Sequence, residues 1–161
     1  MTPDHTERDA AVARVMAKMR AKKAQRVGAD FEQQVRLRLI GLGFEEVERV
    51  ATPMFSLKIR GERKHFHARK VSGDIKAIDP RSGRAVLVEC KCYQDGLPFK
   101  ALAPHQVANL DRTVLHKGIA ILAWGSSELV LLDWAQLRVA GFKRGTSLTE
   151  AMVAAAVYRH R

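Results

Sequence analysis

The segment AVLVECKC, residues 85–92, brings a carboxylate and an ammonium to the end of an otherwise apolar run. Side chains alternate between the two faces of a β-strand, so Glu89 and Lys91 would share one face while Cys90 and Cys92 share the other. Charged groups at the end of a hydrophobic strand cost free energy unless they are paired, exposed in a cleft or bound to a metal ion. The pattern therefore indicates a site for chemistry.

A second carboxylate is spaced so that it can reach the same place. The chain holds three triplets of an acid, any residue and a lysine, which start at Glu62, Asp74 and Glu89. Glu62 lies in a charged turn with a glycine, where a solvated face is the natural interpretation. Asp74 begins the preceding strand, and the turn at 80–83 would bring it to Glu89 across a hairpin. Converging carboxylates repel each other, and a hard divalent cation relieves that repulsion. Alternatively, Asp74 pairs with Lys76 or caps a turn.

The composition limits the class of protein. The 161 residues fit one domain with its own core, and the formal net charge is +11. Such an excess favours a polyanionic partner, although a ribosomal or an anionic-membrane protein would share it. No apolar run could span a bilayer and no secretory signal is recognised, so we expect a cytoplasmic protein without a membrane partner. The two cysteines are expected to be small buried hydrophobes in a reducing compartment.

The hydrophobic pattern predicts an α/β domain with a mixed sheet. A basic helix is expected over 10–27 and would be broken by Gly28, after which Asp30 could cap a second helix over 31–42. Strands are expected over 44–52, 54–60, 64–71, 74–78, 84–91, 118–124 and 128–134.

The carboxyl-terminal part is expected to add two helices. The first would have Pro104 in its first turn and end at Gly118, and a capping box at Ser147 would begin a last helix that reaches Tyr158. Two apolar segments could belong either to the core or to an interface with a second copy: 120–124 and 130–134.

The acid and lysine pattern resembles the core of the PD-(D/E)XK nuclease superfamily. Asp74 is followed, after a tight turn, by Glu89, Cys90 and Lys91, and Gly73 stands where the superfamily has a proline. The resemblance implies a restriction-endonuclease-like fold, in which a mixed central sheet is flanked by helices.

Three further motifs resemble those of Holliday-junction resolvases. Residues 28–32, GADFE, are similar to the G-x-x-F-E helix of the bacterial RecU type and of the archaeal type. Residues 97–102 with the following His105 and Gln106 resemble a stretch of the RecU type, and 118–120 resemble its next strand.

The resemblance implies the ligands of a metal site. Asp74 and Glu89 would hold one or two Mg²⁺ ions, or Mn²⁺, with the backbone carbonyl of Cys90 as a further ligand. Glu32 would hold the second ion or a bound water. The alternative for Glu32 is an ion pair with Arg36, one helical turn further on.

The other matched residues would act on the water and the phosphate. Lys91 would orient the attacking water and help to neutralise charge in the transition state. Gln106 would position the phosphate or Lys91. His105 would cap its helix or contact DNA.

Two basic segments would contact DNA. A helical arm, 1–27, would bind phosphates through Arg14, Lys18, Arg20, Lys22, Lys23 and Arg26. The remainder, 28–161, would form a single nuclease domain, from which a hairpin or loop at about 53–73 protrudes. That protrusion would bind phosphates through Lys58, Arg60, Arg63, Lys64, Arg69 and Lys70, and Phe66 could stack on an open base. A solvated hairpin is the alternative.

The expected function is therefore that of a structure-selective endodeoxyribonuclease. It would resolve four-way (Holliday) DNA junctions by metal-dependent phosphodiester hydrolysis. Because resolution needs two cuts in opposing strands, a homodimer with twofold symmetry is expected. Two alternatives remain: another DNA nuclease on the same fold, of a restriction or flap-processing type, and a DNA-binding protein that keeps the fold without cutting.

Overall fold

The computed structural model describes residues 5–50, 54–59, 62–67, 73–94, 96–125 and 128–159. In 5–12, 54–59 and 62–67 only the backbone is described. The part of the chain so described has no helix with both the length and the hydropathy that crossing a bilayer requires.

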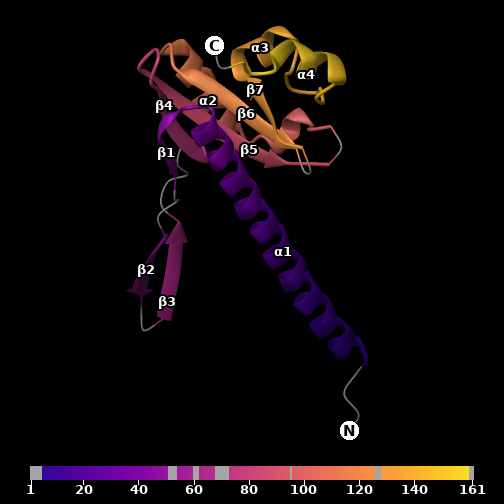
Figure 1. Cartoon of the computed structure of the whole chain (residues 1–161). Helices are drawn as coiled ribbons and strands as arrows, with labels where there is room; N and C mark the ends of the chain where they lie inside the picture. The colour runs from indigo at the N-terminus through magenta and orange to yellow at the C-terminus, as the bar shows by residue number, and fades with distance from the viewer. Residues whose placement is uncertain are drawn as a thin grey trace.

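Five strands form one mixed sheet in the order β1-β4-β5-β6-β7 (Figure 1). They are β1 (Glu45–Arg49), β4 (Ile75–Asp79), β5 (Arg84–Cys92), β6 (Ile119–Gly125) and β7 (Val130–Asp133). Neighbouring strands pair antiparallel except β5 and β6, which pair parallel. Helix α2 (Pro104–Leu115) lies between these two in the chain, as a parallel connection requires. The α/β architecture with a mixed sheet is confirmed.

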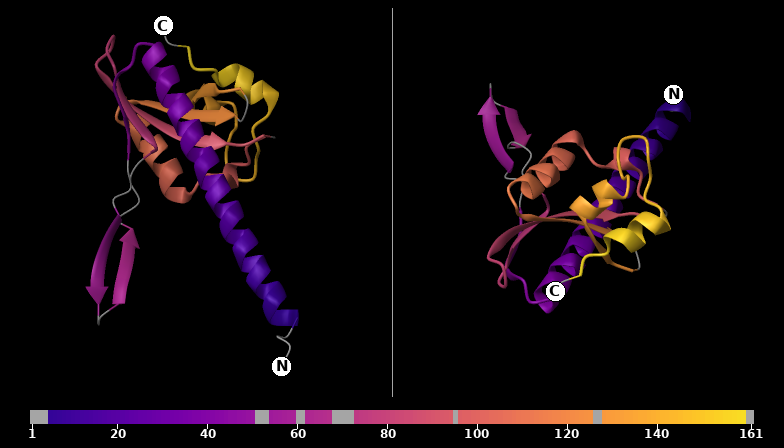
Figure 2. Two further views of the ribbon diagram at one scale, coloured as in Figure 1. Left: turned by 60° about the horizontal axis from the view of Figure 1, so that its bottom comes forward. Right: turned by 90° about the horizontal axis from the view of Figure 1, so that it is seen from above.

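Helices cover both faces of the sheet and create two clusters of buried side chains. On one face, Phe31, Val35 and Leu39 of helix α1 pack against Val86 and Val88 of β5. The opposite face is covered by α2 with the short helices α3 (Trp134–Val139) and α4 (Glu150–Ala156) (Figure 2). The two clusters divide β5 by alternate residues, as the sequence predicted.

Helix α1 runs without interruption from His5 to Gly41. The predicted break at Gly28 and the predicted cap at Asp30 are therefore wrong. A glycine inside a helix costs only about 1 kcal/mol relative to alanine, and its neighbours are mostly good helix formers, so one glycine does not end the helix. The side chains at 13–27 are all exposed, and this half of the helix projects from the body (Figure 1).

The expected hairpin is present as a separate two-stranded sheet. Strand β2 (Met54–Ile59) pairs antiparallel with β3 (Glu62–His67), so the connection is shorter than predicted. The hairpin projects from the same side of the body as the amino-terminal half of α1 (Figures 1 and 2).

The carboxyl-terminal elements differ from the prediction in two respects. Helix α3 was not predicted: Asp133 ends β7 and its carboxylate accepts a hydrogen bond from the Gln136 N–H, which caps the helix. The last helix is capped by Thr149 rather than Ser147, and it ends at Ala156. The apolar segments of β6 and β7 belong to the core, since 120–123, 131 and 132 are buried.

Two glycine substitutions test the backbone account. Gly28→Ala is expected to raise the free energy of unfolding by about 0.5–1 kcal/mol, because an added Cβ meets no atom within 4 Å and the helix gains propensity. At Gly73, φ is +69° and a Cβ would lie 2.5 Å from the Leu87 side chain and 3.1 Å from the Val88 carbonyl oxygen. Gly73→Ala should therefore lower that free energy by more than about 1 kcal/mol. Urea unfolding measures both, and equal effects would contradict this account.

Candidate active site

Two carboxylates meet where β5 approaches its end. The antiparallel register of β4 and β5 pairs Ile75 with Val88, which places Asp74 and Glu89 beside each other. The Asp74 N–H donates to the Val88 carbonyl oxygen at 2.9 Å, and its carboxylate accepts from the Cys90 N–H at 2.7 Å. The side chain of Glu89 is 1% exposed. Backbone pairing thus fixes one acid and burial fixes the other.

Lys91 and Gln106 complete this group of side chains. The Lys91 ammonium lies 2.9 Å from a Glu89 carboxylate oxygen and donates to the Gln106 Oε1 at 3.1 Å. The Gln106 Nε2 donates to the same Glu89 oxygen. Gln106 Oε1 also accepts from the Ala103 N–H at 2.9 Å, which caps α2. One helix terminus therefore positions the amide that links the lysine to the glutamate.

Burial makes the Glu89 carboxylate unusually basic. Desolvation, followed by the negative charge of Asp74, raises the pKa of Glu89 to about 7, and Lys91 only partly offsets the rise. When Glu89 is ionised, the two carboxylates carry more negative charge than one lysine balances. A cation bound between Asp74 and Glu89 would remove this penalty.

The Cys90 side chain points away from the acids. It packs against the core cluster on the α1 side, and burial raises the pKa of its thiol, with nearby carboxylates adding to the effect. A thiolate nucleophile is thereby disfavoured, and the two free cysteines are partly buried small side chains. The role predicted for the Cys90 carbonyl oxygen stays a prediction.

Glu32 has a partner that the sequence did not suggest. Its carboxylate forms an ion pair with Arg49 of β1, whose Nε donates to it at 2.9 Å. Arg36, the predicted alternative partner, instead donates from Nε to the Val47 carbonyl oxygen at 3.1 Å. Glu32 still lies near enough to Cys90 for its charge to raise that thiol's pKa. It therefore stands close to the end of β5, held by an arginine.

Trp124 is a second neighbour that sequence analysis did not single out. It pairs with Lys91 in the parallel register of β5 and β6, so both side chains lie on one face. Its indole N–H is buried, and it has no hydrogen-bond partner among the described residues. A tryptophan just before the glycine that ends β6 was the available signal.

The donor set suits a hard divalent cation. No group of three or more His, Cys, Asp or Glu side chains that could hold a metal ion occurs within the described residues. Mg²⁺ does not need such a group, since it keeps several waters and binds through one or two carboxylates and substrate phosphates. Asp74 and Glu89 could supply these carboxylates, and the raised pKa of Glu89 is the observation that favours a cation here.

The predicted DNA-binding residues are spread over three places. The six basic residues of the arm are all exposed on α1, and none forms an ion pair with another described residue. Lys58, Arg63, Lys64 and Phe66 lie in the hairpin strands, whose side chains are not described, and Arg60, Arg69 and Lys70 lie outside the described residues. His105 is half-buried in the first turn of α2, where Gln106 rather than His105 provides the cap.

Comparison with known proteins shows the fold of the chain. No protein-family model and no curated protein matches it. It is similar to Hjc, a Holliday junction resolvase from the archaeal hyperthermophile Archaeoglobus fulgidus, with a TM-score of 0.54 and 17% identity over 81% of this chain and 94% of that chain. The match with the structure of SSO0001 covers 91% of this chain and 66% of that chain, at 15% identity and with a TM-score of 0.35. The restriction-endonuclease-like fold expected from the motifs, a mixed central sheet flanked by helices, is confirmed.

Replacement of the buried acid tests the electrostatics of the site. Because the folded state raises the pKa of Glu89 from 4.5 to about 7, the wild type loses stability as the pH rises through this interval. Glu89→Gln is isosteric and uncharged, so without divalent metal it should be more stable than the wild type at pH 8, by on the order of 3 kcal/mol, and nearly equal at pH 4. Unfolding curves at both pH values measure this difference. Glu48→Gln, at an exposed position, is the control, and a pH-independent effect of Glu89→Gln would refute the account.

Proposed function

We propose that this protein is a metal-dependent endonuclease that cuts four-way DNA junctions. The observation that carries the proposal is the pair of neighbouring carboxylates, the half-buried Asp74 and the buried Glu89, with Lys91 and Gln106 bonded to Glu89. The fold shared with an archaeal Holliday junction resolvase and the net charge of +11 support a branched DNA as the substrate.

The reaction is hydrolysis of a phosphodiester bond. A water oxygen attacks phosphorus in line with the 3′ oxygen, the bond from phosphorus to that oxygen breaks, and the products are a 5′-phosphate and a 3′-hydroxyl. The water gives up one proton, and the leaving oxygen gains one. A bound Mg²⁺ or Mn²⁺, held by Asp74, Glu89 and the Cys90 carbonyl, would lower the pKa of water and screen the phosphate charge.

Lys91 has a donor left for the substrate. An ammonium has three N–H groups, of which one faces Glu89 and one donates to Gln106. The third can donate to the attacking water or to a phosphate oxygen, because the side chain remains 16% exposed. The charge that develops on the phosphate is then neutralised by a cation held in advance.

Gln106 and Glu32 act on either side of this centre. Gln106 positions Lys91 and Glu89 through its amide and thereby fixes their distance. Glu32 would accept a second ion or a bound water, which requires that it exchange part of its bond to Arg49 for the new partner.

The basic segments would bind the arms of the junction. Helix α1 and the β2–β3 hairpin project from the same side of the body (Figure 2), and the sequence of both is rich in arginine and lysine, which suits a branched polyanion. Such contacts are to phosphates, so they place the junction without reading its sequence. Symmetric resolution would use two copies related by a twofold axis, one active site for each strand.

Cleavage of a labelled, immobile four-way junction with Mg²⁺ tests the proposal. Wild-type protein should introduce paired nicks that leave 5′-phosphates, with a strong preference over duplex and flap substrates. Asp74→Asn and Lys91→Ala should still bind the junction but cut it about 10²- to 10³-fold more slowly. Preferred cutting of flaps or duplex would indicate another nuclease of this fold, and tight binding with no metal-dependent cutting would overturn the enzyme proposal.

The arm is tested by substitutions that preserve its helix. Arg20→Gln, Lys22→Gln and Lys23→Gln together should weaken junction binding and reduce the slope of log K against log salt by up to about 3, since glutamine keeps the helix but releases no counterions. The matched control is Met16→Gln with Met19→Gln, two exposed apolar residues on the same helix. An unchanged slope in the triple variant would show that these residues do not bind phosphates.

A further inference from the structure

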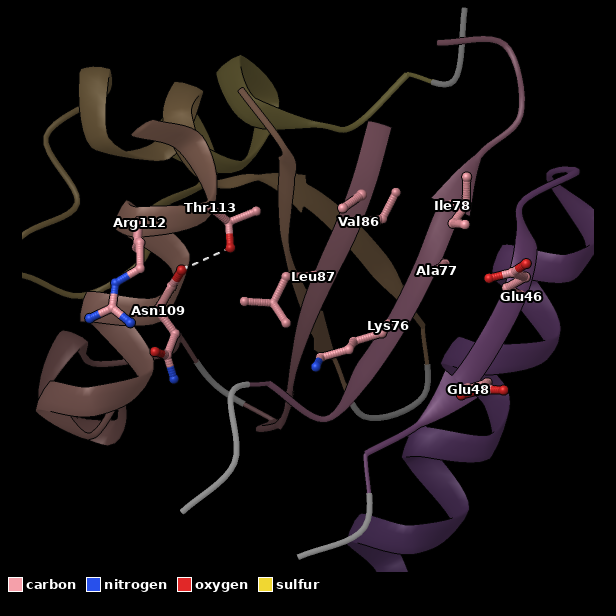
Figure 3. A pocket seen from close by; sticks show the side chains of 11 residues that line it. Glu46, Glu48, Lys76, Ala77, Ile78, Val86, Leu87, Asn109, Arg112 and Thr113 are labelled. Atoms are coloured by element: carbon pink, nitrogen blue, oxygen red, sulfur yellow. Dashed lines mark hydrogen bonds between the residues drawn. The ribbon is translucent and has the colours of Figure 1, made fainter. Parts of the chain in front are cut away.

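A groove of about 460 Å³ lies along the sheet between α2 and β1 (Figure 3). Its floor is formed by β4 and β5, including Lys76, Ala85 and Leu87, and one wall is formed by α2. The groove exists because α2 packs over β5 and β6 and not over β4. This part of the sheet face therefore remains open to a ligand.

The floor of the groove continues directly from the two carboxylates. Lys76 follows Asp74 by two residues, and Leu87 precedes Glu89 by two, so each shares a sheet face with its acid. Lys76 and Leu87 are also paired in the register of β4 and β5. A nucleic acid strand that runs from the two carboxylates along this face would therefore reach Lys76 next.

The wall formed by α2 also connects the groove to the candidate active site. Asn109 follows Gln106 by one helical turn, so both lie on the same side of the helix. Arg112 lines the groove beside it. Figure 3 shows the Lys76 ammonium and the Asn109 amide at the same end of the groove, with Leu87 between them. The two sides thus present polar groups toward one space.

The charges in the groove favour an anion on its α2 side. Among the described residues, neither Lys76 nor Arg112 forms an ion pair, and no hydrogen bond is made by the Asn109 amide. Glu46 and Glu48 line the opposite side, on β1 (Figure 3). An anionic ligand is therefore repelled from β1 and attracted to the α2 side.

We propose that Lys76 and Asn109, with Arg112 beside them, bind the phosphate next to the scissile one on the cleaved strand. This inference rests on the proposed nuclease function, which supplies the scissile phosphate. Two residues of an extended strand span about 6–7 Å, which is comparable to the separation of successive phosphates in a nucleic acid strand. A phosphate held at Lys76 would set the register of the strand, so that its neighbour lies at Asp74 and Glu89.

The first test measures junction binding without divalent metal, so that cutting plays no part. Lys76→Gln should reduce the slope of log K against log salt by about 1, and Lys76→Gln with Arg112→Gln by about 2. The control is Lys143→Gln, which removes one positive charge at an exposed position between α3 and α4. It should leave the salt slope nearly unchanged, because Lys143 does not line the groove. A loss equal to that of Lys143→Gln would overturn the proposal.

The second test locates the phosphate. Junctions that carry a single neutral methylphosphonate one or two positions to either side of the cleavage site are compared in binding to the wild type and to Lys76→Gln. A methylphosphonate at one of the adjacent positions should lower the affinity of the wild type but not that of Lys76→Gln. At the other positions the methylphosphonate should affect both proteins equally. Equal responses of both proteins at every position would refute the assignment.

The two proposals fail in different ways. If the wild type binds but does not cut, the nuclease proposal falls, while a reduced salt slope for Lys76→Gln that Lys143→Gln does not share would still establish phosphate binding in the groove. If the wild type cuts and Lys76→Gln behaves like it in both tests, the groove proposal falls alone. Circular dichroism shows whether Lys76→Gln is folded, which its exposed position leads us to expect.

Discussion

The burial of the Glu89 carboxylate beside Asp74 is the constraint on which this site depends. Two acids in contact at the end of an apolar strand are unfavourable in isolation, and the molecule offsets this by surrounding them with donors: the Cys90 N–H, the Lys91 ammonium and the Gln106 amide. Each donor belongs to a regular element. The order of β4, β5 and α2 in the fold can therefore be understood as the arrangement that makes this charge tolerable.

Much of this arrangement could be predicted from the sequence, because it depends on local periodicity. The alternation of residues in 85–92 correctly separated the acid face of β5 from the face that packs on α1. The turn after Asp79 and the proline that opens α2 also have short-range signals. Since these signals fix β4 and β5, the meeting of Asp74 with Glu89 and Lys91 followed from them, whereas Gln106 was indicated by the resemblance to resolvases.

The features that sequence analysis missed depend on tertiary contacts or on weak local preferences. Gly28 carries a breaking signal worth only about 1 kcal/mol, which the rest of α1 outweighs. The ion pair of Glu32 with Arg49 joins a helix to a strand 17 residues away, so no spacing rule could identify it. The groove could not be predicted either, because it arises from the part of the sheet that α2 leaves uncovered.

The unbroken course of α1 has a mechanical consequence. A helix of 37 residues is about 55 Å long, and among its described side chains the core residues Phe31, Val35 and Leu39 all lie in the carboxyl-terminal turns. The amino-terminal half is thus a lever with its fulcrum in the hydrophobic core. A tilt of 10° at the fulcrum would move a point ~35 Å away by about 6 Å. Where the basic side chains meet a ligand is consequently decided by how the carboxyl-terminal turns of α1 pack against the sheet.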